Sequence, residues 1–238
     1  MSEVLLTLST ATTMASLALT RGETLLAELS LLPSGTPSDI LLPAIDRLLA
    51  DLAMPIEDVD FFAAVLGPGA FTGLRVGVAT IKGLALATGK PVVGVSSLQS
   101  LALQVPDVAT KVYALVDARK GEVYAGCYNW EAGMPQLIGE EKVIDPVLLL
   151  DEIADDAIFV GDGAVAYRTL IVRQLGSRAK FAPWPANSLR AGSAAMLALD
   201  QLRTLGATTP ERLNPVYIRP SDAEINMCKT AADNGIEG

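Results

Sequence analysis

Hydrophobic residues recur with two different periods along the first half of this 238-residue chain. Three short apolar segments, at residues 4–8, 15–20 and 24–31, are joined by polar turns, a pattern that predicts an antiparallel meander. Residues 61–66 form a continuous apolar run, which is typical of a strand buried on both faces, and residues 92–95 form a shorter one. The first half therefore predicts five strands.

Helices are predicted between these strands by apolar residues that recur every three or four positions. The first helix begins near Ser38, a residue suited to be an N-cap, and ends near Pro55. The second covers about residues 72–88, and a third spans about residues 97–104. The apolar positions of the first two helices are Leu41, Ile45, Leu48 and Leu52, followed by Leu74, Val78, Ile81 and Ala85.

The second half repeats this order of elements. Its predicted elements are strands at residues 111–117, 122–130 and 136–144, a helix at 146–153, a strand at 158–160, and helices at 164–175 and 188–205. Two βββαβα-type units point to an α/β fold of the duplicated ribonuclease-H-like kind, as in actin, hexokinase and Hsp70. We expect subdomains at residues 1–106 and 107–220 and a flexible tail at residues 221–238.

Composition indicates whether the protein enters a membrane or an oxidising compartment. Half of the residues are hydrophobic, so the chain can bury a substantial core. No apolar run approaches the roughly 20 residues that span a bilayer, and the first residues lack the basic region of a secretory signal. We therefore expect a cytoplasmic protein that does not enter the membrane. Cys127 and Cys228 are a hundred positions apart, so we expect free thiols.

Histidine is absent from the sequence. Its absence removes the commonest general base, the commonest zinc ligand and every Ser-His or Cys-His nucleophile, so hydrolase functions are disfavoured. The net charge of −9 disfavours binding to the phosphate backbone of a nucleic acid, which requires clustered lysine and arginine.

A glycine-rich junction connects the fourth predicted strand to the second helix. Residues 67–77 read Gly-Pro-Gly-Ala-Phe-Thr-Gly-Leu-Arg-Val-Gly. Unpaired N–H groups at a helix N-terminus can meet an anion or a partner. The same glycines can equally serve only to provide backbone angles that a side chain forbids, and the sequence leaves both interpretations open.

Three segments together resemble the TsaB (YeaZ) family. They are residues 67–77, residues 116–124 with the sequence Val-Asp-Ala-Arg-Lys-Gly-Glu-Val-Tyr, and residues 215–219 with the sequence Pro-Val-Tyr-Ile-Arg. The resemblance covers the chain from the first hairpin to Arg219. It implies a noncatalytic subunit of the bacterial machinery that makes threonylcarbamoyladenosine in tRNA.

The resemblance also implies partners. A TsaD-like catalytic subunit would be bound by the first two helices, and together with a TsaE-like ATPase the assembly would modify adenosine 37 of tRNAs that read codons beginning with A. The same helices would form a homodimer when the partner is missing. Because the chain is acidic, we expect contact with tRNA to be indirect. The eight apolar positions listed above are the predicted interface, and the alternative is that both helices only cover their own sheet.

Several polar residues occupy places where actin-like ATPases bind a nucleotide. Ser9 and Thr10 lie in the first hairpin, where the fold usually carries an aspartate, and a phosphate-bound Mg²⁺ would lose that ligand. The other candidates are Asp117 and Arg119 in the second hairpin and the turn Gly161, Asp162 and Gly163. We interpret all seven as vestigial nucleotide loops, the alternative being that they only stabilise ordinary turns, and we expect no metal and no cofactor. An ATP-dependent phosphotransferase is the alternative function.

Two basic residues lie on the second helix, seven positions apart. Arg75 and Lys82 share a helix face and could meet an acidic partner, or they could simply be solvated.

Overall fold

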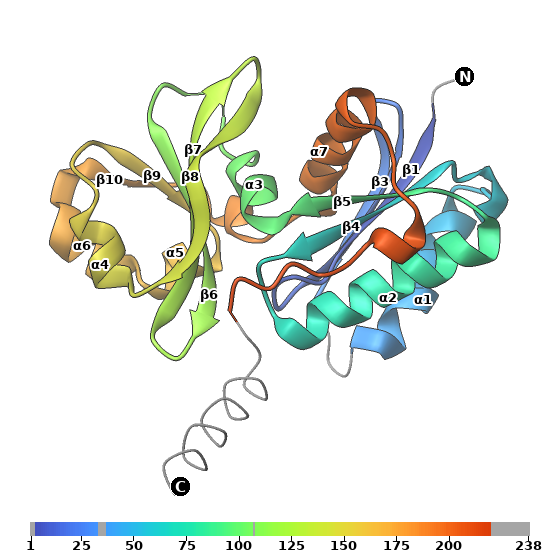
Figure 1. Ribbon diagram of the computed structural model, residues 1–238, viewed down its shortest axis with the longest axis horizontal. Coiled ribbons are helices and arrows are strands. Elements are labelled where there is room, and N and C mark those ends of the chain that lie inside the picture. Colours follow the sequence, from blue (N-terminus) through green and yellow to red (C-terminus); the bar gives the residue numbers. More distant parts are fainter. Residues whose placement is uncertain (1–2, 33–36, 107, 220–238) are drawn as a thin grey trace, which may run out of the picture.

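The computed structural model describes residues 3–32, 37–106 and 108–219. Two five-stranded sheets lie side by side, with helix α3 (Ser97–Ala102) between them (Figure 1). This architecture confirms the predicted α/β fold with two βββαβα-type halves. The predictions for Cys228 and for residues 221–238 lie outside the described residues.

The first sheet contains β1 (Val4–Ser9), β2 (Ala15–Arg21), β3 (Thr24–Leu31), β4 (Phe61–Gly67) and β5 (Val92–Ser96). Their order across the sheet is β3-β2-β1-β4-β5. The first three strands form the predicted antiparallel meander, and β4 and β5 continue the sheet in parallel. β4 is buried over most of its length, as its continuous apolar run predicts.

Helices cover both faces of this first sheet (Figure 1). One face carries α1 (Pro37–Asp51) and α2 (Phe71–Thr88), which contact each other. The opposite face carries α7 (Ala191–Thr204), which comes from the far end of the chain and packs on β1, β2 and β5. The first sheet is therefore completed by a helix that belongs to the second half in sequence. The division of the chain at residue 106 stays a prediction.

The second sheet has the order β10-β9-β6-β7-β8. Its strands are β6 (Lys111–Arg119), β7 (Glu122–Glu131), β8 (Met134–Ile144), β9 (Ala157–Val160) and β10 (Ala179–Phe181). Its helices are α4 (Pro146–Asp151), α5 (Asp162–Ala166) and α6 (Arg168–Leu175). Short 3-10 helices occupy residues 56–58, 176–178, 184–187 and 210–212.

Three details differ from the sequence prediction. The helix expected at residues 164–175 is divided at Tyr167, whose φ of −102° and ψ of 14° leave the helical range. The last helix begins at Ala191 and not at Ser188. The three-residue edge strand β10 was not predicted, because so short a segment has no measurable period.

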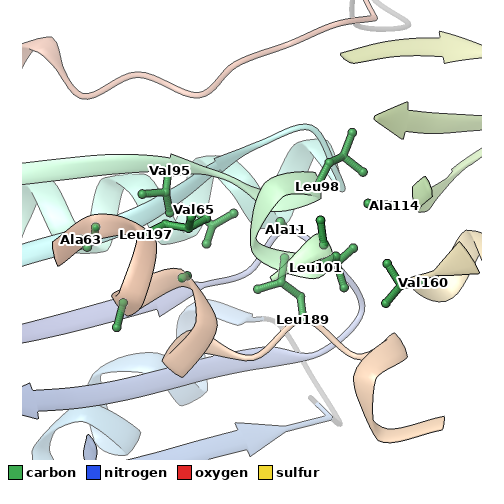
Figure 2. Packing of buried hydrophobic residues seen from close by; sticks show 14 of the residues in the cluster. Ala11, Ala63, Val65, Val95, Leu98, Leu101, Ala114, Val160, Leu189 and Leu197 are labelled. Carbon is green, nitrogen blue, oxygen red and sulfur yellow. The ribbon is translucent and has the colours of Figure 1, made fainter. Parts of the chain in front are cut away.

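A hydrophobic cluster joins the two halves. Leu98 and Leu101 of α3 lie in it among side chains from both sheets, including Val95 and Val160 (Figure 2). All four side chains are at most 6% exposed. Because interiors of this kind are close-packed, this shared cluster holds the two sheets together as one body.

The eight predicted interface residues lie mostly in the core. Leu41, Ile45 and Leu48 of α1 are buried in the core between the helices and their own sheet, and Leu52 is half-buried against it. The α2 residues Leu74, Val78, Ile81 and Ala85 are buried as well, each at most 4% exposed. These stripes therefore face the sheet. Burying a leucine side chain stabilises a fold by about 1.5–3 kcal/mol, which explains this orientation. Of the eight positions, Leu52 keeps part of its side chain accessible, and the role of all eight in partner binding stays a prediction.

Candidate functional site

A cavity of about 480 Å³ lies between the two halves. Its walls come from four segments that are distant in sequence. They are the first hairpin at Ala11–Thr13, the start of α2 at residues 68–71, the second hairpin at residues 116–120, and residues 216–219 near the C-terminal end. This cleft is where the fold brings together most of the polar residues that the sequence analysis singled out.

The glycine-rich junction is explained by its contact with the first hairpin. The Thr10 hydroxyl donates to the Gly73 carbonyl at 2.7 Å, and the Ala70 N–H donates to the Ala11 carbonyl at 2.7 Å. A Cβ on Gly73 would lie 2.2 Å from the Thr10 carbonyl oxygen, which is closer than real Cβ atoms come. Gly73 is therefore required by the close approach of the two backbones, a reason that neither interpretation left open by the sequence included.

Ser9 and Thr10 support the first hairpin from within. Ser9 is 1% exposed, and among the described residues its hydroxyl has no hydrogen-bond partner. Thr10 is 4% exposed and its hydroxyl is bonded to α2. The cavity lining begins at Ala11, so neither side chain reaches the cleft.

The second hairpin is organised by Asp117. Its carboxylate accepts the Arg119 N–H at 2.9 Å and lies 3.2 Å from the Arg119 Nη1. Arg119 and Lys120 adopt the left-handed backbone, with φ values of 62° and 55°, which non-glycine residues rarely adopt. The Asp117 side chain thus stabilises an unfavourable turn.

Asp162 lies behind this hairpin at the start of α5. Its carboxylate accepts the Asp117 N–H at 3.0 Å, and burial raises its pKa above the usual range, although hydrogen bonds from the backbone oppose the shift. A Cβ on the neighbouring Gly161 would lie 2.1 Å from the Leu115 carbonyl oxygen, and the Gly161 N–H donates to the Asn187 side chain. A Cβ on Gly163 would also press on Leu115, at 2.9 Å from its carbonyl carbon. This turn is fitted against β6.

The acidic side chains of the cleft do not form a metal-binding cluster with other described residues. In the part of the chain that the structure describes, no three aspartate, glutamate or cysteine side chains come together in a way that could hold a metal ion. The contact between Asp117 and Asp162 is a hydrogen bond from the Asp117 backbone N–H to the Asp162 carboxylate.

The C-terminal strap, which we define as residues 213–219, closes one rim of the cleft (Figure 1). Leu213 is buried in the first-half core, and the Val216 N–H donates to the Leu66 carbonyl at 2.8 Å. At its other end, Arg219 donates to the Ala118 carbonyl at 2.9 Å and pairs with Glu122. The strap therefore fastens the first half to the second hairpin. In the sequence, residues 215–219 of the strap stand out only through the family resemblance, because the segment has no hydrophobic period.

The outward faces of α1 and α2 form a second candidate surface. Large apolar side chains are exposed there, with Leu42 at 51% and Leu86 at 60%. Other exposed residues on these two helices include Asp46, Arg47 and Ala50 of α1, and Thr72, Ala79, Gly83 and Ala87 of α2. We call this set, with Leu42 and Leu86, the helix face.

Comparisons with known proteins identify the family. The family model described as "TsaD: tRNA N6-adenosine threonylcarbamoyltransferase" matches residues 37–227. The "tRNA threonylcarbamoyladenosine biosynthesis protein TsaB" of Haemophilus influenzae is 31% identical over 232 residues, which cover 90% of this chain and 93% of the relative. The chain belongs to the TsaB (YeaZ) family. The TsaB protein of Escherichia coli is 33% identical over 172 residues, 70% of this chain and 74% of the relative.

A solved structure agrees with this membership. YeaZ from Pseudomonas aeruginosa superposes with a TM-score of 0.76 at 30% sequence identity, covering 90% of this chain and 99% of that one. The TsaB-family fold thus accounts for both sheets and for the cleft between them. Within the residues that the structure describes, every helix is too short or too polar to cross a membrane.

Proposed function

We propose that this chain is a noncatalytic subunit that binds and activates a TsaD-like catalytic subunit in the cytoplasm. With a TsaE-like ATPase, the assembly would attach the threonylcarbamoyl group to N6 of adenosine 37 in tRNAs that read codons beginning with A. Membership of the TsaB family supports this proposal, since the relatives are named as threonylcarbamoyladenosine biosynthesis proteins.

The noncatalytic role is supported by one observation: the carboxylates around the cleft are already bonded to other groups of the chain. The Asp117 carboxylate is engaged by Arg119, and the Asp162 carboxylate accepts a backbone N–H. The first hairpin offers the uncharged Ser9, which is buried away from the cavity. A phosphotransferase would need carboxylates free to hold a metal-bound phosphate, and these are committed to the fold.

Partner binding is assigned to the helix face and no longer to the buried stripes. Exposed apolar side chains such as Leu42 and Leu86 favour a protein contact, and Ala79 and Gly83 allow another helix to approach closely. The same face would serve for a homodimer when the partner is missing. The chain is acidic, so tRNA would be bound mainly by the partner.

A reconstitution experiment tests the function. We expect no ATP hydrolysis and no tRNA modification by the purified chain alone. Modification should appear when the chain is added to TsaD-like and TsaE-like proteins of the same organism together with tRNA, ATP and an activated threonylcarbamoyl donor. ATP turnover that survives repurification and disappears in Asp117→Asn would contradict the proposal and favour the phosphotransferase.

A pair of substitutions tests the surface. Leu86→Glu places a charge on the helix face and should abolish binding to the TsaD-like subunit with little change in melting temperature. Leu48→Glu buries an unpaired carboxylate in the core and should prevent folding at a cost of several kcal/mol. Calorimetric titration and thermal melting give the two readouts. A Leu86→Glu protein that binds normally would exclude this part of the helix face.

A further inference from the structure

Arg75 is held in a fixed position although its side chain is exposed. Its guanidinium carbon lies 3.9 Å above the Phe71 ring centroid and 5.8 Å from the Tyr217 ring centroid. Its Nε donates to the Tyr217 hydroxyl at 3.0 Å, and the two rings are 4.7 Å apart. The helix and the strap thus immobilise this arginine before any partner arrives.

Among the described residues, Arg75 differs from the neighbouring arginines of the cleft because no carboxylate pairs with it. Arg119 is paired with Asp117, and Arg219 is paired with Glu122. No carboxylate of residues 3–32, 37–106 and 108–219 lies within salt-bridge distance of Arg75. With Nε used by Tyr217, its two Nη groups remain available, and they fit one carboxylate as a fork.

The surroundings of Arg75 have the composition of a binding hot spot. Val216 is 49% exposed and Tyr217 is 40% exposed, and both lie in the strap. Arginine and tyrosine are enriched among residues that dominate interface energies, and a preorganised side chain loses less entropy on binding. The cluster also adjoins Thr72 at the start of the helix face.

We propose that Phe71, Arg75 and Tyr217 form an anchor that binds an acidic side chain of the TsaD-like subunit, beside an apolar residue that covers Val216. Charge complementarity selects this occupant, since Arg75 is a cation without a carboxylate partner among the described residues, on a chain whose net charge is −9. The inference rests on the proposed function and adds a charged contact at one end of the helix face. It gives the strap a part in binding as well as in closing the cleft.

The test is a titration of the TsaD-like subunit against matched variants. Arg75→Ala should weaken binding by about tenfold to a hundredfold and reduce its salt dependence. Arg75→Lys should restore little, because an ammonium neither forks nor stacks in the same way. Tyr217→Phe should weaken binding by a smaller factor. Lys82→Ala removes the same charge seven residues further along α2 and should change binding by less than about threefold.

The outcomes separate the two proposals. Wild-type protein that fails to bind the TsaD-like subunit overturns the proposed function and this inference with it. Normal wild-type binding together with an Arg75→Ala affinity within about threefold of it overturns the anchor alone. RNA binding by the free chain that is lost in Arg75→Ala, with partner binding intact, would assign the arginine to a phosphate and also overturn it.

Discussion

The two halves each begin with a hairpin at the same place in the fold, yet the two hairpins are held by different forces. The first hairpin, residues 9–15, rests on α2 through backbone contacts so close that Gly69 and Gly73 have no room for a side chain. The second hairpin, residues 117–122, is held by the carboxylates of Asp117 and Asp162.

This difference shows that the two halves of a duplicated fold can share an order of strands while different interactions hold their hairpins. Steric fit depends on volume and is insensitive to salt and pH. Ion pairs and buried carboxylates depend on both. The first hairpin should therefore respond to added atoms, and the second to changes in charge.

The largest effect is expected at Gly73. Gly73→Ala forces a Cβ against the Thr10 carbonyl and should lower the free energy of unfolding by about 3 kcal/mol. The control is Gly83→Ala on the same helix, where a Cβ meets nothing within 4 Å. That change should raise stability by about 0.5–1 kcal/mol, because glycine disfavours helices. Urea denaturation measures both, and similar shifts in the two variants would refute the steric account.

A smaller effect is expected at Asp117. Asp117→Ala removes the acceptor of the Arg119 N–H and should lower the free energy of unfolding by about 1 kcal/mol. Asp117→Asn keeps a side-chain oxygen and loses only an ion pair whose arginine is 73% exposed, so its effect should be a few tenths of a kcal/mol. If Asn and Ala destabilise equally in urea, charge and not hydrogen bonding holds the turn.

The smallest effect is a pH dependence at Asp162. Burial raises the pKa of its folded-state carboxyl, so the unfolded chain releases this proton first as the pH rises. Wild-type stability should therefore lose a contribution as the pH increases from about 4 through the folded-state pKa. Asp162→Asn retains an acceptor for the Asp117 N–H and lacks this loss. Its stability relative to wild type should grow over that window in urea titrations, and parallel profiles would contradict the assignment.

The sequence predicted most elements well because each of these has a hydrophobic pattern of its own. The continuous run of β4 and the three- and four-residue spacing of α1 and α2 identify a strand and two helices without further information. The position of α7 could not be predicted in this way. Its first N–H groups are accepted by Ser16, at 2.9 Å from Ala191, and by Glu28, at 2.7 Å from Gly192. No local pattern connects residues more than 160 positions apart.

The candidate site was only partly predictable for a related reason. A hydrophobic period identifies the buried side of a helix, and Leu48 lies there, so the period by itself points away from the surface that a partner can reach. The helix face is indicated instead by apolar residues that lie outside the buried stripe, such as Leu42 and Leu86. The anchor at Arg75 depends on Tyr217, a contact across 142 positions.

The return of α7 to the first sheet has a consequence for protein synthesis. Translation produces all five strands of that sheet by Ser96, but the helix that covers their second face is complete only at Thr204. During that interval the nascent chain carries an uncovered sheet face that includes Leu5 and Val93, both buried in the finished protein. Pairing across such sequence distances is slow, and exposed sheet surface promotes aggregation. A fragment of residues 1–106 should accordingly fail to fold alone, and chaperones that hold nascent chains should raise the yield of the full-length protein.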